Sequence, residues 1–211
     1  MKVVAINGSP HKEGNTFQAL SIVGKQLTDN GIDFEIVHIG NKAIHGCTGC
    51  GQCFKNRDEK CSMKDDGVND AIQKMKEADG ILLGSPVYYA GIAGTMKCFL
   101  DRAFYVAGSN GGLFRNKVAA SVVAVRRTGG SVTFDNLNHY LLYSEMMIAS
   151  SNYWNIIHGR TPGEVLQDAE GVQIMDVLGN NMVWQLRMRE ATKDSIPAPA
   201  PVRKVMTNFV R

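Results

Sequence analysis

The stretch VVAINGSPHKEGNT, residues 3–16, decides how the chain folds. A short apolar run leads into small and polar residues, and a helix-forming segment begins near Asn15. A strand that turns tightly into a helix is typical of a sheet with helices on its faces. The free N–H groups and positive dipole end of such a helix suit a phosphate group. The alternative is a plain strand–helix turn capped by Asn15 or Thr16.

The same alternation of strand and helix repeats along the chain. The predicted strands are 3–6, 35–39, 80–84, 118–125 and 153–157. Their near-continuous apolar composition indicates parallel strands that are covered on both faces. Apolar residues recur at helical spacing in 15–29, 67–78, 92–106 and 131–148. The sequence therefore predicts an α/β fold with a doubly wound, five-stranded parallel sheet in three layers.

The last fifty residues differ from this pattern. Residues 164–193 are predicted to be helical, and SIPAPAPVRKVMTNFVR (195–211) follows them. Alternating Pro and Ala cannot continue a helix and favour an extended path. The segment is either a disordered tail or an arm that buries Val202, Val205, Met206 and Phe209 on a neighbouring subunit. We divide the chain into a sheet domain, 1–160, and a C-terminal helix with an extended arm, 161–211, as an oligomer contact.

The composition excludes several classes of partner. The 211 residues carry a net charge of +3 without a clustered basic stripe, which argues against nucleic-acid binding. No apolar run approaches the roughly 18 residues that a membrane-spanning helix needs. The start, MKVVAING, is interpreted as a strand and not as a signal peptide. We expect a cytoplasmic protein whose thiols stay reduced.

Two further loops are expected at the same edge of the sheet as the first. GSPVYYAGIAG (84–94) follows the third strand, and RRTGGS (126–131) follows the fourth. Ligands of open parallel sheets bind at the carboxyl ends of the strands, near the point where strand order reverses. A phosphate cradle, an aromatic wall and glycine-flanked N–H donors together suit flavin mononucleotide (FMN).

Four of the five cysteines lie between residues 47 and 61, in the pattern C-x2-C-x2-C-x7-C. The first three copy the local spacing that wraps thiolates around a 4Fe–4S cluster. Free or redox-active thiols, zinc and a disulfide remain as alternatives, although zinc pairs are usually separated. The candidate metal ligands are Cys47, Cys50, Cys53 and Cys61. Cys98 is interpreted as a small buried apolar residue.

Three motifs, GSPHKEGNT, SPVYYAGIAGTMKCFLDR and TGG, resemble in this order the flavodoxin-like NADPH-dependent FMN reductase superfamily. The segment that carries the four cysteines, residues 46–63 (the cysteine segment), narrows the resemblance to the iron–sulfur flavoproteins. The resemblance covers about residues 1–160 and implies strand order 2-1-3-4-5, bound FMN and a homodimer or homotetramer. It implies that the phosphate is held by Ser9, His11, Gly14, Asn15 and Thr16. It implies that the flavin ring is lined by Pro86, Val87, Tyr88 and Tyr89, with Thr128, Gly129 and Gly130 on its pyrimidine side.

The predicted function is an FMN-dependent oxidoreductase or electron-transfer flavoprotein. The chemistry would belong to the cofactor, so no side chain is assigned as an acid or base. The donor would be NAD(P)H or reduced ferredoxin, and the acceptor a small molecule or a carrier. The alternative from another class is a non-enzymatic zinc-loop binding module that uses Cys47–Cys61.

Three sets of charged residues lie near these motifs. Asp101 and Arg102 are predicted to form an ion pair at a helix end. Asp65 and Asp66, which precede Gly67, are predicted to cap the helix that follows them. Arg126 and Arg127 are either a solvated pair or contacts to an NADPH phosphate or a carrier carboxylate.

Overall fold

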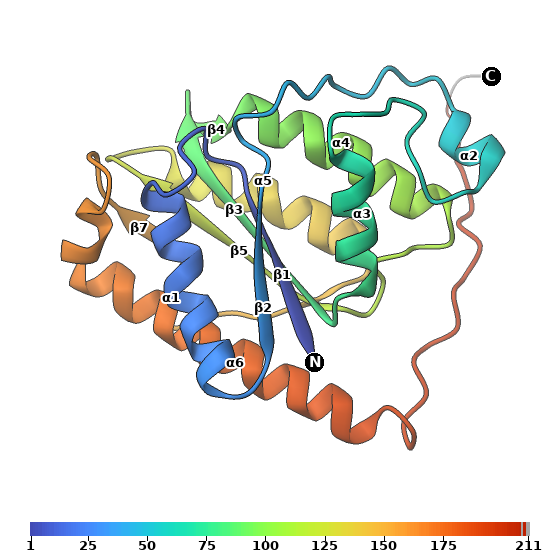
Figure 1. Cartoon of the computed structure of the whole chain (residues 1–211). Helices are drawn as coiled ribbons and strands as arrows, with labels where there is room; N and C mark the ends of the chain where they lie inside the picture. The colour runs from blue at the N-terminus through green and yellow to red at the C-terminus, as the bar shows by residue number, and fades with distance from the viewer. Residues whose placement is uncertain (208, 210–211) are drawn as a thin grey trace.

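A mostly parallel β-sheet forms the centre of the computed structural model, which describes residues 1–207 and 209 (Figure 1). The sheet order is β2-β1-β3-β5-β6, with β4 paired to β3 and β7 paired to β5. This confirms the predicted doubly wound order, because β5, β6 and β7 take the places of the fourth and fifth predicted strands. The strands are β1 (Lys2–Asn7), β2 (Asp33–His38), β3 (Gly80–Tyr88), β4 (Gly91–Ile92), β5 (Val118–Val125), β6 (Met147–Ile148) and β7 (Ile156–His158).

The sheet position predicted for one fifth strand, 153–157, is filled by two short strands, of which only β7 overlaps the predicted range. β6 pairs with the start of β5 and β7 with its end, so the intervening residues leave the sheet. The side-chain amide of Asn155 donates to the Ser121 carbonyl at 3.0 Å, and the Asn155 carbonyl accepts from Val123 N at 2.9 Å. These two bonds satisfy the Ser121 carbonyl and the Val123 N–H of β5, with which a continuous neighbouring strand would otherwise have paired. The sheet therefore has seven strands, where five were predicted.

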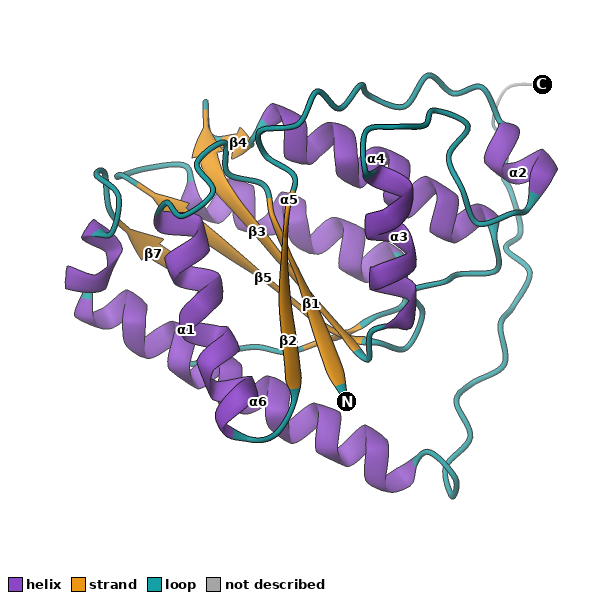
Figure 2. Ribbon diagram, viewed as in Figure 1, coloured by secondary structure: helices purple, strands orange, loops and turns teal. Residues whose placement is uncertain are grey.

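Helices cover both faces of the sheet and make the predicted three layers (Figure 2). The helices are α1 (Asn15–Asp29), α2 (Gln52–Asn56), α3 (Val68–Glu77), α4 (Gly94–Ser109), α5 (Gly130–Tyr143) and α6 (Ala169–Thr192), with a 3-10 turn, η1 (Glu164–Gln167). One apolar cluster joins the sheet to α3, α4 and α5, and a second joins it to α1 and α6. The short helix α2, inside the cysteine segment, was not predicted.

Helix α5 is shorter than the predicted 131–148. It ends because Glu145 adopts a left-handed conformation with φ of 54°. Met146 N then donates to the Leu141 carbonyl at 3.2 Å, and Glu145 N to the Leu142 carbonyl at 3.1 Å. This pair of bonds is the Schellman arrangement that commonly terminates helices. The chain is thereby released to form β6.

The C-terminal arm leaves α6 and runs along the outside of the molecule (Figure 1). Residues 197–207 have no regular structure and are exposed, while 208, 210 and 211 lie outside the described residues. Arg115 Nη1 donates to the Pro199 carbonyl at 2.8 Å, and Lys204 Nζ lies 4.7 Å from the centroid of the Tyr143 ring. The arm is therefore held at two points, although its apolar side chains face solvent.

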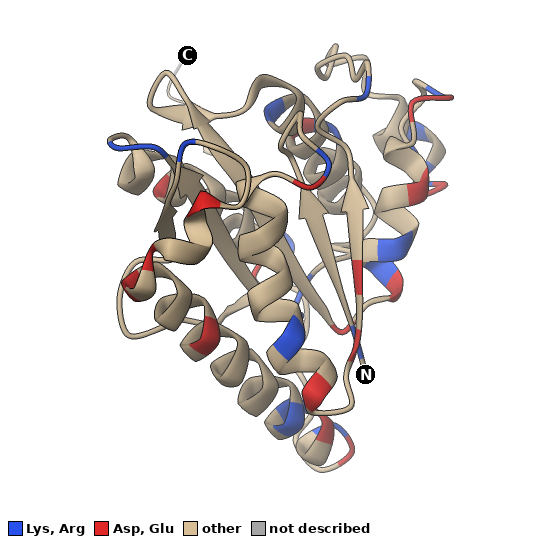
Figure 3. Cartoon of the chain, turned by 60° about the vertical axis from the view of Figure 1, so that its left-hand side comes forward, with Lys and Arg blue, Asp and Glu red and all other residues tan. Residues whose placement is uncertain are grey.

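Basic and acidic positions are interspersed along the chain on the side that faces the viewer in Figure 3. None of the helices in the described part of the chain combines the length and apolar composition needed to cross a bilayer.

The close packing of α1 on α6 yields a test of the second core cluster. A Cβ atom on Gly179 would lie 2.6 Å from Gln26 Cβ and 3.0 Å from the Val23 carbonyl oxygen. We expect Gly179→Ala to lower the free energy of unfolding by about 1–3 kcal/mol, because the helices must separate. Gly108→Ala, at an exposed site in α4 with no atom within 4 Å, should raise it by about 0.5–1 kcal/mol. Urea denaturation of both variants measures the difference, and equal effects would contradict this packing.

Candidate functional site

The loops after β1, β3 and β5 meet at the carboxyl edge of the sheet. Gly8 N donates to the Gly84 carbonyl at 2.9 Å, which joins the first loop to β3. Gly129 has φ of 86°, and a Cβ on it would lie 2.8 Å from Ala90 Cα, so the third loop packs directly on the second. The predicted phosphate, ring and pyrimidine residues therefore lie on three segments that touch one another.

Helix α1 begins with unsatisfied polar groups. Gly14 is its N-cap and supplies no side-chain hydrogen bond, so the first N–H groups of the helix stay free for a ligand. Thr16 is buried, and its Oγ1 atom has no hydrogen-bond partner among the described residues. A buried hydroxyl without a partner costs about 1–3 kcal/mol, which an anion at this helix end would recover. The loop thus fits a phosphate, as the sequence predicted.

The other residues of this loop are held by backbone contacts. Ser9 is buried, its N–H donates to Asn7 Oδ1 at 3.0 Å, and its Oγ accepts from His11 N at 3.2 Å. Asn15 Oδ1 accepts from Gly163 N at 2.9 Å, which ties the start of α1 to the turn before η1. His11 is exposed. Whether each of these side chains contacts a phosphate remains a prediction.

The segment predicted as a loop after the third strand is instead a hairpin between β3 and β4. Its two turn residues, Tyr89 and Ala90, both have positive φ, 48° and 55°. A two-residue turn of this twist requires positive φ at both positions and normally uses Asn and Gly. Non-glycine residues in this conformation cost about 1–3 kcal/mol each, and such strain clusters at functional sites. Tyr89 is fully exposed at the tip, and Tyr88 is 47% exposed.

A cavity of about 290 Å³ lies beside the Thr128–Gly130 turn. Arg127, His158 and the paired rings of Tyr153 and Trp154 line it. Tyr153 and Trp154 are more than half exposed. Asp168, also on the wall, accepts from Gly171 N and His158 N at 3.0 and 2.7 Å, so its oxygens are already occupied. Arg126 does not line this cavity.

The four candidate metal ligands line one small cavity, of about 20 Å³, over helix α4. Cys47 and Cys50 are exposed and Cys53 is buried. A hydrogen bond from the Ser62 hydroxyl, 3.4 Å away, lowers the pKa of the Cys50 thiol. All five cysteines are free, so the disulfide alternative is not found. Within the described chain, no three His, Cys, Asp or Glu side chains are placed to share a single metal ion.

This finding bears differently on zinc and on an iron–sulfur cluster. Four thiolates around zinc must all reach one ion at about 2.3 Å. In a 4Fe–4S cluster each thiolate binds a different iron, so the sulfurs stand farther apart. A shared cavity lined by four thiols has the donor chemistry of such a cluster. The metal role of these cysteines remains a prediction.

Arg102 does not pair with Asp101, so that predicted ion pair is wrong. Asp101 instead pairs with Lys97 and accepts from the Tyr140 hydroxyl at 2.5 Å. Burial alone lowers the pKa of Arg102, but its hydrogen bonds to Asp66 and Cys61 raise the pKa above the ordinary value. Asp66 Oδ1 also accepts a hydrogen bond from Val68 N, the first residue of α3, at 3.2 Å. The N-cap position of α3 is Gly67, so Asp66 bonds to the start of the helix from one residue before the cap.

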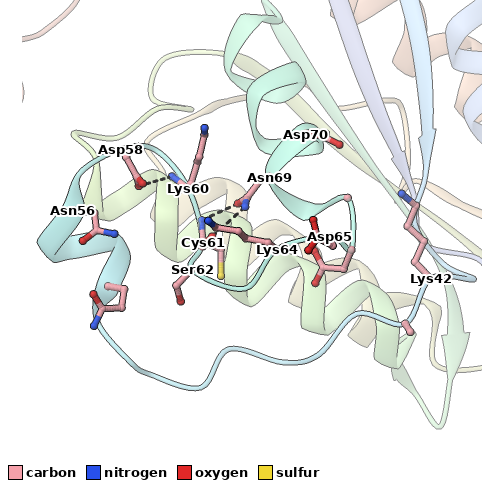
Figure 4. A pocket seen from close by; sticks show the side chains of 14 residues that line it. Lys42, Asn56, Asp58, Lys60, Cys61, Ser62, Lys64, Asp65, Asn69 and Asp70 are labelled. Carbon is pink, nitrogen blue, oxygen red and sulfur yellow. Dashed lines mark hydrogen bonds between the residues drawn. The ribbon is translucent and has the colours of Figure 1, made fainter.

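A large open groove of about 1180 Å³ lies on the outer side of the cysteine segment (Figure 4). Positively charged lysines and negatively charged aspartates both line it. Asn69, on α3, brackets the backbone of Cys61: its Oδ1 accepts from Cys61 N at 2.7 Å and its Nδ2 donates to the Cys61 carbonyl at 3.0 Å. Sequence analysis missed Asn69, which belongs to no local motif, and the buried position of Arg102, because the motif that ends at Arg102 does not show which distant residues surround it. An arginine beside the apolar stripe of α4 was the only signal.

The comparisons with known proteins agree with this geometry. The family described as NADPH-dependent FMN reductase matches residues 1–161. An iron–sulfur flavoprotein of Methanocaldococcus jannaschii is 34% identical over 195 residues, which cover 89% of this chain and 98% of the relative. FerB, an NAD(P)H:(acceptor) oxidoreductase of Paracoccus denitrificans, has a TM-score of 0.64 at 16% identity, covering 89% of this chain and 97% of that one. A flavodoxin from the domain Archaea has a TM-score of 0.56 at 15% identity, covering 89% and 99%.

The unpartnered hydroxyl of Thr16 leads to a prediction about ligand affinity. We expect Thr16→Val to weaken FMN binding by about tenfold or more, because a hydrogen bond to a charged phosphate is lost. The unliganded protein should lose no stability, since Oγ1 has no partner there. Thr28→Val, at the other end of α1, is the matched control and should leave FMN affinity unchanged. Fluorescence titration measures affinity, and unaltered binding in Thr16→Val would refute a role in phosphate binding.

Proposed function

Because the chain belongs to the NADPH-dependent FMN reductase family, and within it to the iron–sulfur flavoproteins, it is an FMN-dependent oxidoreductase, and we propose that its cysteine segment carries a 4Fe–4S cluster. One observation carries the proposal: the four cysteines line one cavity in the segment after β2. That segment leaves the sheet at the same edge as the flavin loops. A non-enzymatic zinc module does not agree with membership of this oxidoreductase family.

The chain would hold FMN at both of its ends. Thr16, Ser9 and the free N–H groups at the start of α1 would bind the phosphate. The β3–β4 hairpin would lie along the ring, and the backbone donors at 128–130 would bond its pyrimidine side. When bound, FMN would be able to accept two electrons from a nicotinamide and release them one at a time.

The residues around the ring define where a reactant would approach. Tyr88 and Tyr89 are exposed at the hairpin, where they can cover a planar reactant. Arg127 stands at the neighbouring cavity with two aromatic rings, which suits an anionic nucleotide. We propose NAD(P)H or reduced ferredoxin as the donor, a small molecule or a carrier as the acceptor, and the cytoplasm as the compartment.

Cys47, Cys50, Cys53 and Cys61 would bind the cluster, which supplies single-electron transfer when present. Glycines within this segment leave its backbone free to adjust: Gly49 and Gly51 both have positive φ, 66° and 68°. Cys47 and Cys50 are exposed and Cys53 is buried, so Cys53 would stay anchored while Cys47 and Cys50 close over the cluster.

The absorbance spectrum of anaerobically purified protein tests the proposal. We expect flavin bands with a broad brown shoulder that dithionite bleaches. Replacing Cys47, Cys50, Cys53 or Cys61 by Ala should remove the shoulder and leave the flavin bands, because each substitution deletes one ligand. Cys98→Ala is the matched control and should keep both.

If the parent protein shows flavin bands without a shoulder, the assignment as an FMN-dependent oxidoreductase stands and the proposed cluster is refuted. Reduction of the anaerobic protein by NADH, NADPH or reduced ferredoxin, followed by stopped-flow absorbance, then identifies the donor. A shoulder that survives in every cysteine variant would show that these thiols are not the ligands.

We further propose that the C-terminal arm packs on a second copy of the chain. Val202, Val205 and Met206 are 88%, 87% and 80% exposed on a segment that is nevertheless anchored by Arg115. Contiguous apolar side chains on an ordered segment are typical of a subunit contact.

Deletion of residues 197–211 should therefore reduce the number of subunits per particle, because it removes these apolar contacts. FMN affinity should stay unchanged, since the flavin loops lie elsewhere. Sedimentation velocity measures the particle mass. An unchanged mass in the truncated protein would remove the arm from the subunit interface.

A further inference from the structure

The guanidinium of Arg102 is fully buried beneath the cysteine segment. Its Nε donates to Cys61 Sγ at 3.3 Å, its Nη2 donates to the Met63 carbonyl at 3.0 Å, and its Nη1 pairs with Asp66. The Arg102 side chain has no exposed surface, and that of Asp66 is 15% exposed. A helix in the sheet domain thus places a permanent positive charge directly against one of the four thiols.

Cys61 is held at both its backbone and its sulfur. Asn69 brackets its backbone with bonds of 2.7 and 3.0 Å, while Arg102 contacts its sulfur from the opposite element, α4. Cys47 and Cys50 lie exposed on the outer part of the segment. A buried charge therefore lies against the sulfur of Cys61 before any cofactor is present.

A charged N–H donor against a ligand sulfur has a definite electrostatic consequence. Reduction of an iron–sulfur cluster adds negative charge that spreads over its sulfurs. Hydrogen bonds to those sulfurs, the net charge nearby and solvent exposure set the reduction potential. The effect is larger in a buried site, where the effective dielectric constant is low.

We propose that Arg102 is a positioning residue that holds Cys61 and raises the reduction potential of the cluster, and that Asp66 limits this effect by neutralising part of its charge. The inference rests on the proposed cluster. Arg102 transfers no proton and no electron, and its hydrogen bond remains in place in both redox states. The ion pair connects the cysteine segment to α4, so a helix that packs on the sheet would help to set the reduction potential of the cluster.

Two substitutions should move the potential in opposite directions. Arg102→Lys keeps the charge but loses the fork that reaches Cys61, Met63 and Asp66 together, so the potential should fall. Asp66→Asn removes the counter-charge and leaves the guanidinium in contact with Cys61, so the potential should rise. Asp65→Asn is the matched control: it is the exposed neighbour with the same change of charge and should have little effect.

The experiment is an anaerobic redox titration of each purified holoprotein, followed by electron paramagnetic resonance for the cluster and absorbance for the flavin. Iron and sulfide content and FMN content are measured on the same samples. We expect each of the two substitutions to change the equilibrium constant for one-electron reduction by about tenfold, which is about 59 mV. The flavin potential should stay the same in all samples.

Each outcome separates this inference from the proposed function. A parent protein with FMN but no iron would refute the cluster itself. A loaded Asp66→Asn protein whose cluster potential equals or lies below that of the parent would overturn the inference and leave the cluster standing. An unchanged or higher potential in Arg102→Lys would do the same.

Loss of iron from Arg102→Lys with FMN retained would support its role in holding Cys61. If Arg102→Lys loses FMN as well, the substitution has disturbed the fold, and Asp66→Asn decides alone.

Discussion

The parallel direction of β1, β3 and β5 is the constraint on which the site depends. Parallel strands bring their carboxyl ends to one edge, so segments that are far apart in sequence must meet there. Strand register makes the meeting exact enough for contact, since Asn7, at the end of β1, pairs with Gly84 of β3. Gly129 can then pack on Ala90 only because it lacks a side chain. The site is thus a consequence of strand direction before it is a matter of individual side chains.

The same edge concentrates features that reduce stability. Thr16 keeps a buried hydroxyl without a partner, α1 begins without a side-chain cap, and two non-glycine residues occupy the hairpin turn in left-handed conformations. In the middle of the sheet, by contrast, Asn155 satisfies backbone groups of β5. A ligand with a phosphate at one end would satisfy the groups at α1, so binding and folding are coupled through this edge.

The cysteine segment is ordered by a different principle. It contains one short helix, and none of its cysteines forms a disulfide. Its order depends on buried polar contacts, chiefly the Arg102–Asp66 pair and the Asn69 bracket around Cys61. Removing one member of a buried ion pair is strongly destabilising, because the remaining charge has no partner. The segment is therefore joined to the sheet domain through charge, whereas the helices are joined to the sheet through apolar packing.

The sequence by itself determined the strand–helix alternation, the parallel direction of the strands and the three segments that meet at the edge of the sheet. These follow from apolar periodicity and turn residues, which act over a few neighbouring positions. Only the tertiary structure decided that two short strands fill the fifth sheet position, that the loop after β3 is a hairpin, and that Arg102 pairs with Asp66 and not with its neighbour Asp101. In each case the deciding contact joins distant residues: Asn155 reaches Ser121 across 34 positions, and Arg102 reaches Cys61 across 41. Local pattern carries no information about such partners, because burial and charge pairing arise only after the elements have packed.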